Sequence, residues 1–409
     1  MQRRTFLKMA GIRLVGICLM LLCSVTVVIG AGEVGSKPGY TSVRPGSNPC
    51  LLLDGEPYFP FGYYNFSFCP KQVYLDTNVK LQSDGFNSCK TWNVRGSRSG
   101  EMTIADFLEC VDDAAVKNIK YMAVPCGDPG DDWELVRQGK NKPAILAWNV
   151  TDDACGQPVG KVRNDCAAVK SIDPNHVTHI SLNKSPDKSR NYDKRLEACD
   201  MASNQLYPIR DGKREGNLFE DFIRGSAHVD RCLAKGKIPT ADLQSFHWYS
   251  ANARMPTGPE TDVMTYFAII AGVKGIAYYK IQDEDYTNSF QAIDVDHPEV
   301  YAAIKTCASE ILGSLKDPLL NGVLTRTNLG NYCAAGQWVY NSNVYVIVAN
   351  GSRSSANLSV PLVSGAGTDA IKLFSHRDGG MTVSGGKLTG SVGSMKVHIY
   401  TLPYSPQGR

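Results

Sequence analysis

Two adjacent carboxylates, Asp152 and Asp153, follow a strongly apolar run of the chain. Like charges held side by side repel one another, so the pKa of one of these carboxyl groups should rise. A carboxyl group that stays protonated near neutral pH can act as a general acid. A second acidic cluster at 283–285, with Asp283 and Glu284 at its start, follows a later apolar run and either supplies a partner carboxylate or forms a solvated loop.

Aromatic, amide and basic side chains occur near the ends of the same apolar runs. A sugar ring has apolar C–H faces that lie on aromatic rings and hydroxyl groups that need donors and acceptors. As a set, these residues favour a carbohydrate-binding cleft, whereas core packing is the alternative for each aromatic residue taken singly. The candidate substrate-binding residues are Tyr63, Tyr64, Asn65, Lys90, Trp92, Tyr207, Gln244, His247, Trp248 and Tyr279.

Eight short apolar runs alternate with helical patterns and must position these side chains. The runs span 58–65, 86–92, 120–125, 145–153, 176–183, 201–208, 242–248 and 275–281. Such a rhythm predicts an α/β fold, the (β/α)8 or TIM barrel, whose functional residues lie at the C-terminal ends of the strands. The competing fold is an open doubly wound sheet, but its glycine-rich phosphate turn is missing after the first run.

The first 31 residues have the layout of an export signal: a positive start, an apolar run and then small residues. The run RRTFLK at 3–8 resembles the twin-arginine signal of bacteria. We therefore expect an exported protein, periplasmic or extracellular. An uncleaved anchor over 14–29 is the alternative, because this stretch is nearly long enough to span a membrane. No other apolar run has that length, so no stable membrane insertion is expected after signal removal.

The pattern changes near Leu320, beyond which short alternating runs are separated by Gly, Ser and Asn. Short strands with turn residues and no helical pattern predict a small all-β sandwich. The expected organisation is an export signal over 1–31, a linker over 32–49, a barrel of catalytic type over 50–320 and a C-terminal β-sandwich over 321–409.

Several phrases resemble clan A glycoside hydrolases. The segments LDGEPYFPFG at 53–62 and GFNSCKTW at 85–92 are similar to the first and second strands of that clan. PAILAWNVTDD at 143–153 resembles the fourth strand, which normally ends in Asn-Glu-Pro or Asp-Glu-Pro. DPNH at 173–176 resembles the entry to the fifth strand, and 256–279 resembles the seventh helix and eighth strand. The resemblance implies the same barrel, often followed by an accessory β-sandwich.

The resemblance also implies a pair of carboxylates, one general acid/base and one nucleophile, at the ends of strands four and seven. The strand-four position corresponds to Asp153, preceded by Asp152, although the clan has Glu there and Pro where this chain has Ala154. The strand-seven segment at 243–248 contains no Glu, and the nearest one is Glu260.

Three explanations fit that departure. The segment after strand eight supplies the partner through Asp283, Glu284 or Asp285; the enzyme inverts with a wider pair; or the protein binds sugar without catalysis. We favour an exported glycoside hydrolase that cleaves O-glycosidic bonds of an oligo- or polysaccharide by paired-carboxylate catalysis. The alternative is a non-catalytic carbohydrate-binding protein on the same scaffold, and a weaker third is a barrel hydrolase or lyase for another polar substrate.

Other chemistries receive little support. Of the net charge of +3, four positive side chains lie in the first 31 residues, so the body is nearly neutral and has no basic stripe for nucleic acid. The 13 cysteines form no C-x-x-C pair. His176 and His179 are three apart on a predicted strand and should face opposite sides. We therefore expect no metal and no cofactor.

The export signal leads to a direct prediction. Replacing Arg3 and Arg4 with Lys should retain the protein in the cytoplasm, because the arginine pair is the feature that resembles the export signal. Cell fractionation of a tagged full-length chain measures the effect. Unchanged export of this variant, or export from a host without the twin-arginine pathway, would contradict the prediction.

Overall fold

A computed structural model describes residues 39–65, 70–91, 102–125, 133–209, 215–248, 254–281 and 293–406 of the chain. The expected export signal, Trp92 and the acidic cluster with Asp283 and Glu284 lie outside the described residues, as does the side chain of Asn65.

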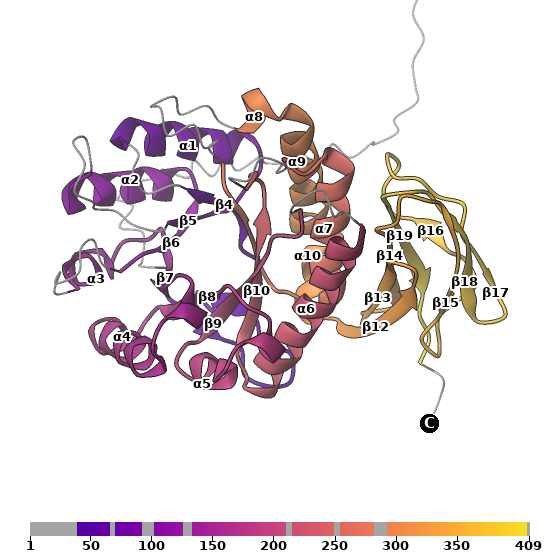
Figure 1. Cartoon of the computed structure of the whole chain (residues 1–409), viewed down its shortest axis with the longest axis horizontal. Helices are drawn as coiled ribbons and strands as arrows, with labels where there is room; N and C mark the ends of the chain where they lie inside the picture. The colour runs from indigo at the N-terminus through magenta and orange to yellow at the C-terminus, as the bar shows by residue number, and fades with distance from the viewer. Residues whose placement is uncertain are drawn as a thin grey trace, which may run out of the picture. The chain divides into compact units, whose positions relative to one another are not determined.

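Eight parallel strands of the described chain close into a barrel (Figure 1), which confirms the predicted TIM fold. Around the barrel the order is β10, β11, β4, β5, β6, β7, β8 and β9, so the first and last strands of the series meet between β11 and β4. The strands are β4 (Phe61–Asn65), β5 (Ser88–Thr91), β6 (Lys120–Ala123), β7 (Ile145–Thr151), β8 (Val177–Leu182), β9 (Met201–Leu206), β10 (Ile238–Gln244) and β11 (Ile276–Tyr279).

Helices surround this barrel (Figure 1), and two of them begin with a capping box. Thr103 forms a capping box with Asp106, and Thr257 forms one with Glu260. These reciprocal bonds satisfy backbone groups that a helix start leaves open. The helices are α1 (Lys71–Ser83), α2 (Ile104–Val116), α3 (Glu134–Gly139), α4 (Val159–Ile172), α5 (Tyr192–Leu196), α6 (Glu215–Ala234), α7 (Gly258–Ala271), α8 (Ile293–Asp296), α9 (Pro298–Leu312) and α10 (Lys316–Asn321), with 3-10 turns η1 (Ala154–Gly156) and η2 (Pro186–Lys188).

Two strand predictions were wrong in their bounds. The seventh barrel strand begins at Ile238 and ends at Gln244, four residues earlier than the predicted run, so His247 and Trp248 lie beyond it. Its first half contains Pro239, which cannot donate to a ladder and therefore weakens the sequence signal. The predicted first strand is also divided, because Tyr58 belongs to a separate hairpin.

That hairpin sheet consists of β1 (Thr41–Val43), β2 (Leu51–Leu53) and β3 (Glu56–Tyr58). Its Leu51 packs with Met122, Val177 and Ile238, all from barrel strands. The Thr41 hydroxyl donates to the carbonyl of Leu146 in β7. The range 32–49, predicted as a linker, therefore contains a strand that belongs to the fold.

Beyond α10 the chain forms two antiparallel sheets, as predicted for the C-terminal region. One has the order β12-β13-β14-β19-β16 and the other β15-β18-β17. Buried side chains such as Val346, Leu388 and Tyr400 form a core of their own. The strands are β12 (Val323–Gly330), β13 (Cys333–Tyr340), β14 (Asn343–Asn350), β15 (Ala356–Pro361), β16 (Ile371–Lys372), β17 (Thr382–Ser384), β18 (Lys387–Val392) and β19 (Lys396–Pro403).

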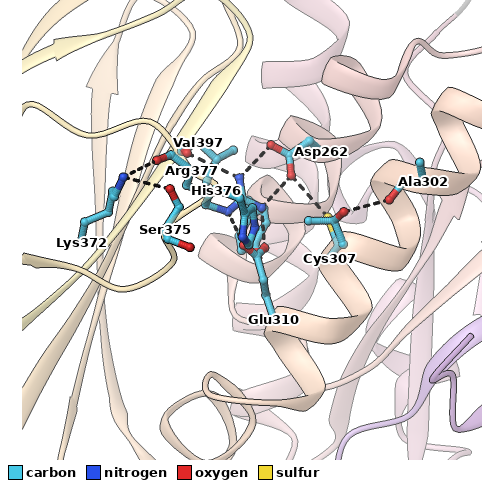
Figure 2. A network of polar contacts seen from close by, with 11 residues as sticks. Asp262, Ala302, Cys307, Glu310, Lys372, Ser375, His376, Arg377 and Val397 are labelled. Atoms are coloured by element: carbon cyan, nitrogen blue, oxygen red, sulfur yellow. Dashed lines mark hydrogen bonds and ion pairs between the residues drawn. The ribbon is translucent and has the colours of Figure 1, made fainter.

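A buried arginine connects these sheets to the barrel helices (Figure 2). The Arg377 guanidinium, from the segment after β16, donates to both carboxylate oxygens of Asp262 in α7 at 3.0 and 2.9 Å. It also donates to Glu310 in α9 at 2.6 Å and lies 4.6 Å from the centre of the Tyr266 ring. Tyr266 donates its hydroxyl to the same Glu310. Because these charges are largely withdrawn from water, each depends on its partners.

Replacing Arg377 with Met should lower the free energy of unfolding by about 3–5 kcal/mol, because the buried Glu310 and the partly buried Asp262 would lose the guanidinium that balances their charges. Urea unfolding of the full chain measures the loss. The matched control is Lys396→Met, which breaks the pair with Asp378 where both side chains are more than half exposed. This pair should contribute about 0–1 kcal/mol. Equal losses in the two variants would contradict the prediction.

Candidate active site

The interior of the barrel holds a buried ion pair between Lys90 of β5 and Asp242 of β10. The ammonium and carboxylate lie 2.8 Å apart, and both side chains are almost fully buried. The same carboxylate oxygen accepts hydrogen bonds from the hydroxyls of Ser181 in β8 and Ser203 in β9, each at 2.6 Å. Four strands thus bring polar side chains to one point, where the Lys90 ammonium balances the charge of Asp242 and the two serines hold its carboxylate.

Strand alternation explains which residues reach this point. Alternate side chains of a strand face the same side, so Ser203 and Gln205 of β9 both face the barrel interior. Lys90 was predicted from the sequence as a site residue, but Asp242, Ser181, Ser203 and Gln205 were not. A lysine within one apolar strand needs a buried acidic partner in another strand. Asp242, the acidic residue within the predicted seventh strand, could have been identified from the sequence on this ground.

Gln205 connects the ion pair to the two adjacent carboxylates at the end of β7. Its amide nitrogen donates to Asp153 at 2.8 Å and lies 3.3 Å from Asp152 and 3.2 Å from the Ser181 hydroxyl oxygen. Asp153 is exposed and has a left-handed backbone conformation, with φ at 48°. This turn directs the two neighbouring side chains toward the same amide.

Asp152 is the carboxyl group with altered acidity. Burial raises its pKa to about 6, and the nearby charges of Asp153 and Asp242 add to the rise. The Lys90 ammonium and the Ser181 hydroxyl act in the opposite direction. The side chain is partly exposed, so it can exchange a proton with a ligand or with solvent. The sequence argument that one of the two carboxyls has a raised pKa therefore applies to Asp152.

Aromatic rings form a wall beside these carboxylates. The Tyr64 ring lies 4.4 Å from the Lys90 ammonium, and its centroid is 5.2 Å from that of Tyr279. The ring centroid of Tyr207 lies 6.1 Å from that of Tyr279 and 6.2 Å from that of Trp248. The Tyr64 hydroxyl is buried and has no hydrogen-bond partner among the described residues. Four of the predicted binding residues are thus brought together at one end of the barrel, along with Lys90.

Other predicted residues lie elsewhere. Tyr63 points away from the barrel interior and stacks on Tyr301 of α9 at 6.0 Å, so the expectation of a substrate contact is not supported there. Gln244 is fully buried. Its amide oxygen accepts from the backbone N–H of Ile209, and its amide nitrogen donates to the carbonyls of Ile209 and Phe246, so the side chain supports the loop after β9 and does not face a ligand. His247 follows the strand, with Nδ1 3.2 Å from the Trp248 carbonyl oxygen.

Glu260, the nearest glutamate to the seventh strand, is also committed to structure. It accepts hydrogen bonds from Arg254 and from Thr257 at the start of α7. These donors hold the pKa of its carboxyl below the usual range, although burial acts against them. A group that is ionised and fully bonded in this way is a poor partner for Asp152.

The described residues contain no group of three or more His, Cys, Asp or Glu side chains placed to hold a metal ion. His176 lies between the Asp173 carboxylate and the Gly39 carbonyl, whereas His179 contacts Asn149. Within the same described ranges, every helix is too short or too polar to cross a membrane.

Solved structures of several glycoside hydrolases have a similar fold. A family 5 glycoside hydrolase from Bacteroides vulgatus superposes with a TM-score of 0.62 and 15% identity, over 90% of this chain and 94% of the other. A further glycoside hydrolase structure superposes with a TM-score of 0.63 and 14% sequence identity, over 90% of this chain and 98% of the other. The α-amylase of Geobacillus thermoleovorans, solved in complex with acarbose, superposes with a TM-score of 0.59 and 13% sequence identity. The match covers 84% of this chain and 98% of the other. No family model and no curated protein matches the sequence. The comparisons thus show the fold of the chain, a (β/α)8 barrel followed by C-terminal antiparallel β-sheets.

The altered acidity of Asp152 leads to a prediction about stability. Its folded pKa of about 6 lies above the ordinary value of about 3.9 expected when unfolded. Below about pH 4 the carboxyl is protonated in both states and its burial costs no charge, so its contribution to the free energy of unfolding is complete. This contribution is lost as the pH rises from about 4 to 6, because the unfolded chain releases the proton before the folded protein does. Replacing Asp152 with Asn should leave stability nearly unchanged at pH 4 and raise it at pH 8, by on the order of 2 kcal/mol.

Urea unfolding at the two pH values measures this difference. Asp153→Asn is the matched control, because Asp153 is the adjacent carboxylate and is exposed. If the two variants show the same dependence on pH, burial of Asp152 is not the cause.

Proposed function

We propose that this protein is an exported glycoside hydrolase that cleaves O-glycosidic bonds, with Asp152 as the proton donor. The observation that carries the proposal is the position of this carboxyl: it directly follows the fourth barrel strand, its pKa is about 6, and aromatic rings lie beside it. A general acid works best when its pKa lies near the operating pH. The role predicted for Asp153 is therefore assigned to its neighbour, and Asp153 helps to raise the pKa of Asp152.

In the proposed reaction the substrate sugar lies on the wall formed by Tyr64, Tyr207, Trp248 and Tyr279. The protonated Asp152 donates its proton to the glycosidic oxygen while the bond from that oxygen to the anomeric carbon breaks. The leaving sugar departs as a neutral alcohol, and a second carboxylate acts on the anomeric carbon directly or through water. Gln205 holds the donor in place during this step.

We assign the second carboxylate to the acidic cluster at 283–285. Asp242 is unsuitable, because Lys90 and two serines already bind its oxygen. β10 ends in the amide Gln244, and the segment 243–248 contains no Glu, although the clan that the sequence resembles has a carboxylate at the end of this strand. The cluster begins a few residues after β11, which lies between β10 and β4 in the barrel.

A non-catalytic carbohydrate-binding protein is the second candidate. The observation that favours it is again the seventh strand, which ends in Gln244 and offers no free carboxylate among the described residues. The two candidates differ in one result: a binder retains sugar without releasing products, whereas the enzyme releases products at a rate that depends on Asp152.

Replacing Asp152 with Asn should lower turnover of an unactivated glycoside by about 10²–10⁴-fold, because Asn cannot donate the proton. Sugar binding should persist, since shape and polarity are conserved. An aryl glycoside with an activated leaving group should lose much less at the bond-breaking step. Product release from both substrates, measured by chromatography, provides the comparison.

Asp153→Asn is the matched control and should retain most of the activity. Equal turnover of the unactivated glycoside by wild type and Asp152→Asn would refute the assignment of the donor. Binding of saccharides with no products from wild-type protein would favour the non-catalytic candidate.

A further inference from the structure

One hydroxyl of the barrel interior belongs to two hydrogen-bonded sets. The hydroxyl of Ser181, in β8, donates to Asp242 at 2.6 Å and accepts from the amide nitrogen of Gln205 at 3.2 Å. The same nitrogen lies 3.3 Å from a carboxyl oxygen of Asp152. Ser181 therefore lies between the carboxylate of the buried ion pair and the carboxyl proposed as the proton donor.

The set around Asp242 contains more donors than its acceptor oxygen needs. The Lys90 ammonium at 2.8 Å and the hydroxyls of Ser181 and Ser203 at 2.6 Å all donate to the same carboxylate oxygen, Oδ2. One carboxylate oxygen offers about two lone pairs. If Ser181 turns away, Lys90 and Ser203 still occupy both of them, so Asp242 remains bonded and its charge remains balanced.

The set around Gln205 has the opposite imbalance. Its amide nitrogen carries two protons, whereas oxygens of Asp153, Ser181 and Asp152 lie 2.8, 3.2 and 3.3 Å from it. Asp153 is the nearest of the three, so Ser181 and Asp152 compete for the second proton. A protonated Asp152 needs this donor little, but its carboxylate form, which is only partly exposed to water, needs another one.

The Ser181 hydroxyl can supply that donor, because a serine O–H group rotates while its oxygen atom stays in place. Burial raises the pKa of Asp152, and the Ser181 hydroxyl is one of the groups that lower it through a hydrogen bond. The titratable and charged groups that face Asp152 among the described residues are Lys90 of β5, Asp153, Asp242 of β10, Tyr64 of β4 and Tyr207 after β9. The cation in this set, Lys90, is already bonded to Asp242, so the hydroxyl is the donor that is free to turn.

We propose that Ser181 is a positioning residue that exchanges one hydrogen bond between the two carboxylates. Its hydroxyl donates to Asp242 while Asp152 is protonated, and turns to Asp152 once that group has lost its proton. Ser181 itself keeps its proton throughout. The proton of Asp152 goes to the glycosidic oxygen in the reaction, which rests on the proposed function, or to water in the free protein, which needs no substrate.

The test is an NMR titration of the Asp152 carboxyl carbon in the full chain without substrate. Ser181→Ala should raise the midpoint from about pH 6 to about pH 7, because a hydrogen bond to a charged group contributes roughly a tenfold factor to its ionisation. Ser181→Cys keeps the shape with a weak donor and should raise it as well. The control is Thr240→Val, which removes a buried hydroxyl of β10 that has no hydrogen-bond partner among the described residues, and it should leave the midpoint unchanged.

A double-variant cycle separates exchange from the simple loss of a donor. In Ser203→Ala, Asp242 needs Ser181 in place of the missing hydroxyl, so the Asp152 midpoint should rise, but by less than in Ser181→Ala. Adding Ser203→Ala to Ser181→Ala should change nothing further. An unmoved midpoint in Ser181→Ala, or in Ser181→Cys if the alanine variant does not fold, would overturn the proposal. An equal effect of Ser203→Ala with and without Ser181 would overturn it too.

Hydrolysis is measured separately on the same variants. The alkaline limb of the pH profile of kcat/KM should move upward in Ser181→Ala by the same amount as the NMR midpoint, with KM nearly unchanged. Turnover that depends on Asp152, together with an unmoved midpoint, would refute the exchange and retain the hydrolase. A raised midpoint with no products from the wild-type chain would support the exchange and refute the hydrolase.

Discussion

The barrel mouth depends on the buried ion pair between Lys90 and Asp242. Charges withdrawn from water are costly unless they are paired and hydrogen-bonded, and here Ser181 and Ser203 complete the bonding. The pair fixes the positions of four strands and supplies charges of both signs beneath Asp152. It also removes Asp242 from catalysis, which leaves the partly buried Asp152 as the group whose proton is held near neutral pH. The proposed acid chemistry therefore follows from a structural ion pair.

Most of the fold was predictable because barrel strands and helices leave different periodicities in the sequence. The runs near Ile145 and Met201 matched their strands closely, since their apolar residues begin where the ladders begin. The seventh strand was misplaced, because Pro239 lies in a central strand where an unpaired ladder position is unusual. The hairpin strand that ends at Tyr58 was predicted as one strand with β4, because Pro60 between them is compatible with extended backbone and marks no reversal of the chain, unlike Gly55 between β2 and β3.

The candidate site was predictable only in part. Tyr63 and Tyr64 are neighbours of the same type, and only the register of β4 decides that Tyr64 faces the interior while Tyr63 packs on α9. The partner of Lys90 lies 152 residues away in the chain, so local patterns cannot identify it. The choice between Asp152 and Asp153 depends on burial, which arises from strands β8 and β9. The acidic pair itself was visible, because adjacent carboxylates after an apolar run are unusual without a chemical role.

The central claim is that the fold holds a proton on Asp152 near neutral pH. The most direct measurement is a titration of the side-chain carboxyl carbons by NMR, with the Asp152 signal assigned through its loss in Asp152→Asn. We expect a midpoint near pH 6 for this signal. A midpoint at or below about 4, the ordinary range for aspartate, would contradict it and remove the basis for a general acid at the end of β7.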